Sequence, residues 1–253
     1  MSEENDQLWF ETSLGKYLHE YEQRYFDQAV ANIFGYNAAQ IGLPKFDFLR
    51  TNRMPLKFGA GTCTGVVLRT RPDFLPIESS SMDLVLLPHV LEFNENPHQI
   101  LREVHRVLRP EGNIIISGFN PLSLWGTRRH FEKNKKDFPW RGNFIALPRL
   151  KDWLKLLDFE MTEGRLYCYT PPFGRQKWRK RFNFMEAAGD RWWPISGGVY
   201  FLQAVKRTHG MRIIKPGWRN SLARRKKIAS AAQRYNDDIV NKTSHIDAKS
   251  NYE

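Results

Sequence analysis

Residues 82–117 constrain the fold of this chain more than any other stretch. The stretch begins and ends with a nearly continuous apolar run: Met-Asp-Leu-Val-Leu-Leu at 82–87 and Asn-Ile-Ile-Ile-Ser at 113–117. Continuous apolarity is typical of a strand that is buried on both faces, as in a parallel sheet. Between the runs, apolar residues recur at helical spacing: Ile100, Leu101, Val104, Val107 and Leu108. The pattern predicts a strand–helix–strand unit with a turn at 109–112.

The rest of the chain continues this α/β pattern. Helical periodicity predicts helices over 14–34 and 149–157, and short apolar runs predict strands over 38–42, 159–169 and 198–206. Residues 54–70 hold two apolar runs around a Gly/Thr-rich turn, which we interpret as two strands and a candidate hairpin. Two final strands close in sequence favour a doubly wound, mostly parallel sheet with an antiparallel edge strand.

Composition excludes several classes of protein. With 253 residues and 41% apolar residues, the chain can bury one good-sized core and carry an appendage. No apolar run approaches the roughly 18 residues that suggest a membrane span, and the acidic N-terminus has no apolar signal core, so we expect a cytoplasmic protein. Cys63 and Cys168 are far apart and show no metal-ligand spacing, so we expect reduced thiols and no metal site.

Positive charge is concentrated toward the C-terminus. Of the chain's net charge of +12, eight units come from the segment after residue 205, which holds twelve basic and four acidic residues. Arg224, Arg225, Lys226 and Lys227 form its densest cluster. Such a cluster binds the phosphates of RNA or an anionic surface through salt-sensitive contacts, or it serves as a solubilising, disordered end. The sequence leaves these alternatives open.

Residues 75–121 carry a specific motif series. Leu75-Pro76-Ile77, Met82-Asp83-Leu84-Val85, His89-Val90-Leu91-Glu92 and Arg106 to Gly112 stand in the order and spacing of the type-11 domain of class I S-adenosylmethionine-dependent methyltransferases. The stretch also resembles a bacterial set called YafS-like, which ends this strand in Ser-Gly-Phe-Asn-Pro, as Ser117 to Pro121 do here. The resemblance implies a seven-stranded, Rossmann-like sheet with S-adenosylmethionine bound across the carboxyl ends of its strands.

The resemblance also implies where the cofactor binds. The implied contacts follow the first, third and fourth strands, at Ile41, Gly42, Arg71, Asp73, Phe74, Leu75, Pro88 and His89. The chain departs from the family at the first loop, where Gln40 replaces an acid and Pro44 and Phe46 replace glycines. Arg71 stands where the family often has the Asp that contacts adenine, and Asp73 is the candidate replacement. No ribose-binding acid is evident near 54–61.

Other candidate residues have a functional and a structural interpretation. His89 at the cleft mouth is a weak candidate for a catalytic base, or it caps backbone groups. Asn120 and Pro121 stand beside the expected acceptor site, or they form a turn. Arg179, Lys180 and Arg181, among Trp and Phe residues, form a candidate basic and aromatic cover for the acceptor, or a solvated loop.

These observations predict three parts: an N-terminal helical segment at 1–36, a methyltransferase-like domain at 37–207 and a basic, largely disordered tail at 208–253. The leading hypothesis is an S-adenosylmethionine-dependent methyltransferase with an unidentified acceptor. The alternative is a catalytically inactive binding module of the same fold, whose tail binds RNA or another anionic partner. A nicotinamide-dependent oxidoreductase fits less well, because GxGxxG is absent.

Overall fold

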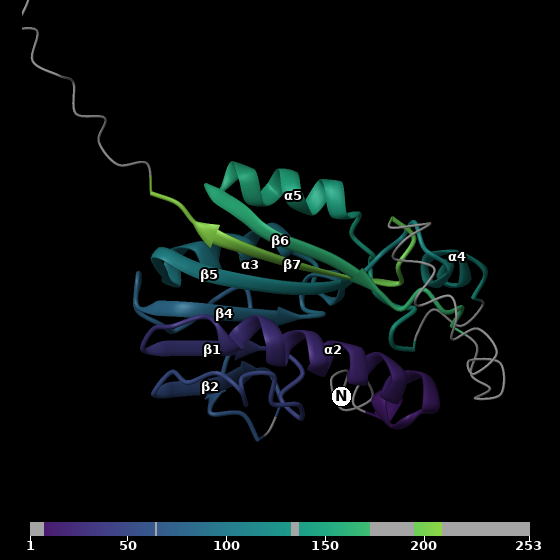
Figure 1. Ribbon diagram of the computed structural model, residues 1–253, viewed down its shortest axis with the longest axis horizontal. Helices are drawn as coiled ribbons and strands as arrows, with labels where there is room; N and C mark the ends of the chain where they lie inside the picture. The colour runs from purple at the N-terminus through teal and green to yellow at the C-terminus, as the bar shows by residue number, and fades with distance from the viewer. Residues whose placement is uncertain (1–7, 64, 133–136, 173–194, 209–253) are drawn as a thin grey trace, which may run out of the picture. The chain divides into compact units, whose positions relative to one another are not determined.

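One seven-stranded sheet organises the part of the chain that the structure, a computed structural model, describes: residues 8–63, 65–132, 137–172 and 195–208. The strands lie in the order β3-β2-β1-β4-β5-β7-β6 (Figure 1). Their bounds are β1 Asn37–Ile41, β2 Leu56–Gly61, β3 Leu68–Arg69, β4 Met82–Pro88, β5 Leu108–Phe119, β6 Phe159–Tyr167 and β7 Val199–Lys206. The predicted strand at 38–42 and the two strands of the 82–117 unit are confirmed.

The sheet is mostly parallel, as predicted. Strands β1 to β5 pair in parallel, while β7 pairs antiparallel with β5 on one side and with β6 on the other. The strand that runs against the rest is therefore β7, and it lies one place in from the edge. Chain order reverses between β1 and β4, and open α/β sheets bind their ligands at the carboxyl ends of strands at such a switch point.

The structure corrects the predicted hairpin at 54–70. Both strands form, but β2 and β3 pair in parallel, with Ala60 opposite Leu68 and Gly61 opposite Arg69. Only two residues of β3 take part, so the chain has to return by only about 7 Å to begin a parallel strand. The connection at 62–67 is long enough for that return. The two strands were predicted correctly, but the direction of their pairing was wrong.

The predicted turn at 109–112 lies inside β5. Met82 pairs with Leu108 and Leu84 pairs with Asn113, so residues 109–112 bulge opposite Asp83. Asp83 has a structural role at this bulge. Its carboxylate accepts hydrogen bonds from the backbone N–H groups of Tyr36 and Asn37 at 2.8 and 2.9 Å, and it pairs with Arg109. Asp83 therefore ties the bulge to the start of β1.

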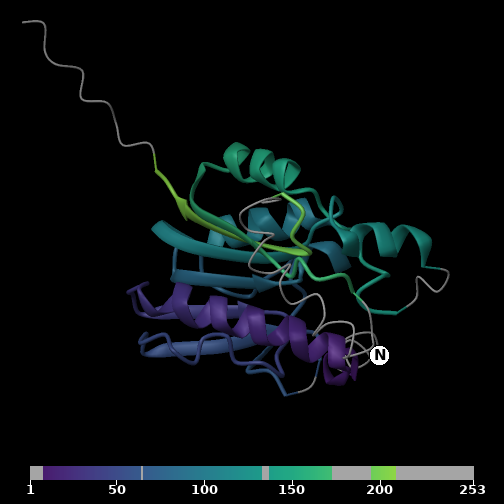
Figure 2. The same ribbon diagram turned by 45° about the vertical axis from the view of Figure 1, so that its right-hand side comes forward.

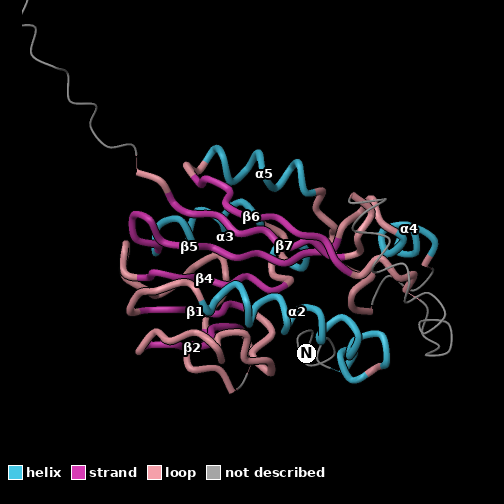
Figure 3. The backbone as a smooth tube through the Cα atoms, in the orientation of Figure 1, coloured by secondary structure: helices cyan, strands magenta, loops and turns pink. Residues whose placement is uncertain are grey.

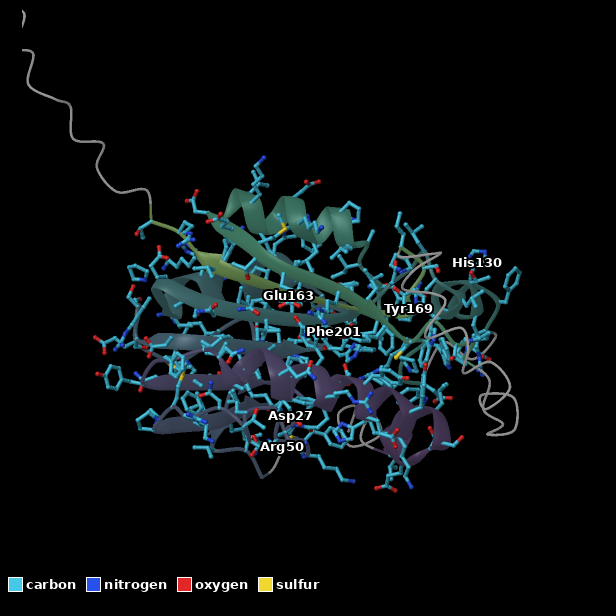
Figure 4. All side chains as sticks on the ribbon, in the orientation of Figure 1. Asp27, Arg50, His130, Glu163, Tyr169 and Phe201 are labelled. Atoms are coloured by element: carbon cyan, nitrogen blue, oxygen red, sulfur yellow. The ribbon has the colours of Figure 1, made fainter. Side chains whose placement is uncertain are left out.

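Helix α2 (Ser13–Ala31) covers one face of the sheet. Thr12 caps its N-terminus by accepting a hydrogen bond from Gly15 N–H, as Ser, Thr, Asp and Asn commonly do. The helix runs across the front of β1 and β4 in Figures 1 and 2. Its apolar side packs against alternate residues of the strands, including Ala38, Leu84 and Leu86. An ion pair between Asp27 and Arg50, in which Arg50 Nε lies 2.9 Å from Asp27 Oδ1, fastens α2 to the segment before β2 (Figure 4).

Helices α3 (Pro97–Val107) and α5 (Leu147–Leu156) cover the opposite face. Ile100, Leu101, Val104 and Val107 of α3 are fully buried there, as the helical spacing predicted. The intervening residues of the strands, such as Val85 and Leu87, point to this side. Figure 1 shows α3 behind the sheet and α5 along the edge near β6. Two further elements, η1 (Leu91–Phe93) and α4 (Leu124–Phe131), follow β4 and β5.

The connecting segments gather at the carboxyl ends of the parallel strands (Figure 3). The predicted basic and aromatic cover at 178–193 and the basic cluster at 224–227 lie outside the described residues, as does the predicted tail at 208–253 from residue 209 onward. Among the helices that the structure describes, none combines the length and the apolar character needed to cross a membrane.

Candidate cofactor cleft

A cleft of about 350 Å³ opens at the carboxyl ends of β1 and β4. That volume is within the range of about 300–1,000 Å³ that is usual for ligand sites. Of the residues predicted to contact a cofactor, five line the cleft: Gly42, Arg71, Asp73, Pro88 and His89. The lining also includes Pro44, Thr62, Val90, Phe93, Asn94, Glu95, Phe138 and Arg141. The cleft lies at the switch point of the sheet, where the fold places a ligand.

Gly42 brings the loop after β1 close to the segment after β4. Its φ is +87°, a backbone conformation that L side chains rarely adopt. A Cβ atom there would lie 2.7 Å from Val90 Cγ2, which is closer than such atoms approach. The next residue, Leu43, also has a positive φ of 44°. Glycine at 42 is therefore required by both the backbone angle and the close approach.

Gln40 holds this loop from inside. The side chain is buried, and its Nε2 lies 3.1 Å from Gly42 O, 3.1 Å from Leu43 O and 2.8 Å from Phe46 O. Its Oε1 accepts a hydrogen bond from Phe48 N–H at 3.0 Å. A carboxylate would accept hydrogen bonds but could not donate to the carbonyl groups. The amide that replaces the family's acid therefore serves the loop backbone in this chain.

Phe46, at the position of a family glycine, points away from the cleft. Its ring lies 4.0 Å from the ring of His19 and 5.0 Å from that of Phe10, measured between centroids. These contacts attach the loop to α2 and the segment before it. Lys45 extends the attachment through an ion pair with Glu11 at 2.8 Å. The loop therefore replaces glycines by packing against the N-terminal helix.

Arg71 and Asp73 pair at one end of the cleft. Arg71 Nε donates to Asp73 Oδ1 at 2.9 Å. The hydrogen bond from Arg71 and its positive charge hold the pKa of Asp73 below its usual value, so the carboxylate is charged at neutral pH. The remaining predicted contacts lie elsewhere: Phe74 is exposed to solvent, whereas Ile41 and Leu75 are in the core.

His89 follows β4 and is buried between two carboxylates. Its Nδ1 lies 2.6 Å from Glu92 Oε1, and its Nε2 lies 2.6 Å from Glu22 Oε1, although the second contact is not aligned as a hydrogen bond. The three side chains are almost fully buried, with exposed fractions of 0–1%. Ser117 Oγ donates to Glu22 Oε1, and Phe119 N–H donates to Glu92 Oε1, both at 3.2 Å. We call Glu22, His89 and Glu92 the buried triad.

The triad changes the interpretation of His89. Burial alone would lower the pKa of His89, but the charges of Glu22 and Glu92 outweigh burial and raise it to about 10. Both ring nitrogens face carboxylates, so neither is available to take a proton from a ligand. The residue as a whole is 4% exposed while its side chain is 0% exposed, so His89 reaches the cleft with its backbone. Its φ of 51° is unusual for a residue other than glycine. The hypothesis of a catalytic base at His89 therefore has no support in this geometry.

Glu22 was missed in the sequence analysis. It lies on the buried side of α2, one turn from Leu18 and one turn from Phe26, both of which are fully buried. A carboxylate inside an apolar stripe has to be paired when the helix packs. That signal was present in the sequence, but the partner lies 67 positions away and could not be identified from the pattern.

Asn120 acts in a turn. Its Nδ2 donates to the carbonyl oxygens of Ile195 and Gly197 at 2.8 and 3.0 Å, and its Oδ1 accepts from Leu122 N–H at 3.0 Å. Pro121 follows in the same turn, against the start of α4, where Pro121 O would lie 2.0 Å from a Cβ on Gly126. Neither residue lines the cleft. Of the two interpretations offered for this pair, the contacts favour the structural one.

The other end of the cleft is aromatic and basic. Phe93 of η1 and Phe138 stack with their centroids 4.7 Å apart, and the guanidinium of Arg141 lies 5.3 Å from the centroid of Phe93. Asn143 N–H donates to Glu92 O at 2.7 Å, which joins the segment at 137–143 to η1. Sequence reasoning did not identify Phe93, Phe138 or Arg141, because no motif marks them.

Comparison with known proteins agrees with this architecture. The family model of the methyltransferase domain matches residues 23–116. The chain is 38% identical over 143 residues to the uncharacterized protein YafS of Escherichia coli, an alignment that spans 56% of each chain. It is 33% identical over 94 residues to the uncharacterized protein MJ1123 of Methanocaldococcus jannaschii, which spans 37% of this chain and 46% of the relative. The chain therefore spans about half the length of the curated relatives that it matches.

Solved structures share the fold at low sequence identity. A methyltransferase from Thermotoga maritima superposes with a TM-score of 0.54 and 18% identity, covering 76% of this chain and 97% of that one. A methyltransferase from Mesorhizobium loti superposes with a TM-score of 0.53 and 15% sequence identity, covering 72% of this chain and 96% of that one. The [4+2]-cyclase SpnF also superposes, with a TM-score of 0.52 and 13% sequence identity, covering 74% of this chain and 80% of that one. At these identities the likeness concerns the fold, and SpnF indicates that the fold serves more than one reaction.

The strand order and the cleft at the switch point define a class I methyltransferase fold. The family model of the methyltransferase domain, which matches residues 23–116, agrees with this fold. The predicted fold is thereby confirmed, and the comparisons support the predicted family and S-adenosylmethionine as the cofactor.

Proposed function

We propose that this protein transfers a methyl group from S-adenosylmethionine, bound in the cleft between β1 and β4, to an acceptor at the aromatic end. The observation that carries the proposal is the loop at Gly42. It keeps a positive φ and passes so close to Val90 that no side chain fits, although the family's other glycines are replaced. A loop without a ligand to accommodate has no evident need for this close approach.

The residues around the cleft suit the cofactor. Gly42 and Pro88 would hold its methionine part against the ends of β1 and β4. The charged Asp73 would accept a hydrogen bond from the adenine amine, at the end of the cleft where Arg71 fixes its carboxylate. Thr62, after β2, offers a hydroxyl where the family uses an acid to bind the ribose. The roles of these four residues are part of the proposal.

The alternative of an inactive module required that Pro44, Phe46 or Arg71 fill the cofactor space. Phe46 packs on His19, outside the cleft. Arg71 lines the cleft, where its guanidinium is paired with Asp73. Pro44 lines the cleft, yet a volume of about 350 Å³ stays open. The open volume supports the enzyme over the inactive module.

The chemistry requires alignment more than acid–base groups. S-adenosylmethionine supplies an electrophilic methyl on a sulfonium. As the acceptor's lone pair forms the new bond, the electron pair of the carbon–sulfur bond remains on sulfur. The contribution of the protein is to hold the two reactants in line. Phe93 and Phe138 would hold an apolar or aromatic acceptor, with Arg141 beside them.

Calorimetric titration of the full chain with S-adenosylmethionine and S-adenosylhomocysteine tests the proposal. We expect saturable binding of both ligands, and a loss of at least tenfold in affinity for Gly42→Ala, because the added Cβ meets Val90. Gly59→Ala is the matched control, since a Cβ on that glycine of β2 has nothing within 4 Å. If neither ligand binds at millimolar concentration (about −4 kcal/mol or weaker), the proposal is wrong.

We also propose, from the sequence, that the basic segment around Arg224–Lys227 binds RNA or another polyanion. Eight of the chain's twelve net positive charges lie beyond residue 205. Binding through phosphates is independent of sequence and weakens steeply with salt. Deleting residues 215–253 should abolish salt-sensitive retention on immobilised RNA, and unchanged retention would refute this role.

A further inference from the structure

The buried triad places one imidazole between two carboxylates. Neutral imidazole has one N–H and one lone pair, yet both ring nitrogens of His89 lie 2.6 Å from carboxylate oxygens. A lone pair that faces a carboxylate at this distance would be repelled, so the ring carries a proton on each nitrogen. One imidazolium and two carboxylates leave a net charge of −1. Moving either proton along its contact onto a carboxylate does not change this total.

The second oxygen of each carboxylate brings no compensating group to the triad among the described residues. Glu22 Oε2 and Glu92 Oε2 are buried, and neither has a hydrogen-bond partner among the described residues. The oxygens that are partnered, the Oε1 atoms, receive hydrogen bonds from Ser117 and from Phe119 N–H, which do not change the charge. Removing charges from water is costly unless they are paired, so an unmatched charge is retained in a protein interior only at a cost in stability.

The triad lies directly behind the wall of the cleft. His89 lines the cleft with its backbone, and the imidazole extends from that backbone into the core. A ligand at Pro88 and His89 would therefore be separated from the triad's charge by the backbone of this segment. The loop at Gly42, which would hold the methionine part, lies across from the same segment, because a Cβ on Gly42 would meet Val90. Two of the acids that the family places near the cofactor, at position 40 and after β2, are absent here, and Arg71 stands in the place of a third.

We propose that Glu22 and Glu92 are positioning residues that fix His89 behind the cleft and, with it, provide a net negative charge that favours the cationic sulfonium of the cofactor. The inference rests on the proposed function and deepens it, because it concerns recognition at the same site. It also makes α2 part of cofactor recognition, since Glu22 is supplied by that helix. The buried triad thus replaces, from behind the cleft, the negative charge that the altered loop has lost.

The comparison of two ligands isolates charge from structure. S-adenosylmethionine and S-adenosylhomocysteine share the adenosine and amino-acid parts but differ by the methyl group and its positive charge. Glu22→Gln keeps the size of the side chain and removes one negative charge. We expect it to weaken S-adenosylmethionine about tenfold more than S-adenosylhomocysteine, the size expected for a unit charge at roughly 10 Å in an effective dielectric of about 20.

Titration calorimetry of the full chain at pH 7.5 gives both affinities for each variant. Glu20→Gln is the matched control, because Glu20 lies on the same helix and is exposed; it should leave the ratio of the two affinities unchanged. Glu92→Gln removes the same charge from η1 instead of α2, so it provides a second measurement if the change on α2 prevents folding. Circular dichroism establishes that each variant is folded.

Three outcomes are distinguishable. A loss of selectivity for S-adenosylmethionine in Glu22→Gln or Glu92→Gln, but not in Glu20→Gln, supports the proposal. An equal loss of affinity for both ligands would mean that the triad is only structural, and it would overturn the proposal while leaving the proposed function intact. Failure of the unmodified protein to bind either ligand would overturn both.

Discussion

Replacing Gln40 by the family's acid should damage this protein. The amide Nε2 has two hydrogens and contacts three backbone carbonyl oxygens of the loop at 2.8–3.1 Å. In Gln40→Glu, an acceptor replaces that donor, and the carbonyl groups lose their partner inside the protein. The bond from Phe48 N–H to the remaining oxygen can persist. The substitution is therefore conservative in shape and unfavourable in chemistry.

The size of the effect follows from the contacts. Two lost hydrogen bonds contribute about 1 kcal/mol each, and the repulsion between a buried carboxylate and carbonyl oxygens adds to that loss. We expect the free energy of unfolding to fall by about 2–4 kcal/mol at pH 8. That is a large part of the 5–15 kcal/mol typical of a folded domain.

The pH dependence distinguishes this mechanism from a general loss of packing. Burial and the facing carbonyl groups should raise the pKa of the introduced carboxyl above its unfolded value. Below that raised pKa the carboxyl is protonated and donates one hydrogen bond, so the deficit is small. The deficit grows as the pH rises through the raised pKa. We therefore expect Gln40→Glu to be closer to the unmodified protein at pH 5 than at pH 8.

Urea unfolding at both pH values measures this difference. Gln28→Glu is the matched control, because Gln28 is exposed on α2 and its replacement should change stability by less than about 0.5 kcal/mol. Calorimetry with S-adenosylhomocysteine should show weaker binding to Gln40→Glu, because the cofactor loop is no longer fixed. Equal stability of the variant and the unmodified protein at pH 8, with full ligand affinity, would refute this reasoning.

Three further predictions concern other parts of the molecule. Arg106 donates to Leu75 O and Ile77 O at 2.8 and 2.9 Å; Arg106→Lys should reduce the free energy of unfolding by about 1–2 kcal/mol, measured with urea, because an ammonium cannot reproduce the planar fork. Asp73→Asn should weaken S-adenosylmethionine and S-adenosylhomocysteine equally, by about tenfold in calorimetry, because both contain adenine; a change confined to one ligand would contradict the assignment. The pKa of His89 is raised to about 10, so its stabilising contribution is complete below about pH 6.5 and is lost as the pH rises through 10. Melting curves of His89→Asn should therefore lack this alkaline loss of stability.

The regular parts of the fold were predictable because they depend on local patterns. The apolar runs at 82–87 and 113–117 and the spacing of Ile100, Val104 and Val107 are properties of neighbouring residues. They fixed the strand–helix–strand unit before any contact was known. The direction in which β3 pairs was not predictable in this way, because the same two runs suit a hairpin or a parallel pair. The choice depends on the path of the connection through space.

The site was predictable only where it follows the ends of strands. Gly42, Asp73, Pro88 and His89 were placed at the cleft because strand ends in a parallel sheet meet at one edge. The role of Gln40 was not predictable, since the loss of an acid did not reveal that its replacement would donate hydrogen bonds to the loop. The pairing of Glu22 with His89 joins α2 to the end of β4, and no local pattern determines such a partner. The positions of Phe93 and Arg141 at the cleft could likewise not be predicted from any local pattern.

The position of β7 has a consequence for synthesis of the chain on the ribosome. β5 contains Ile114, Ile115 and Ile116, and β7 is its partner on one side. β7 ends at Lys206, 87 residues after the end of β5 at Phe119. At roughly 5–20 residues per second, the exposed edge of β5 therefore waits roughly 4–17 s for its partner. An unpaired apolar strand edge is a template for aggregation, so we expect the nascent chain to need a chaperone most during this interval.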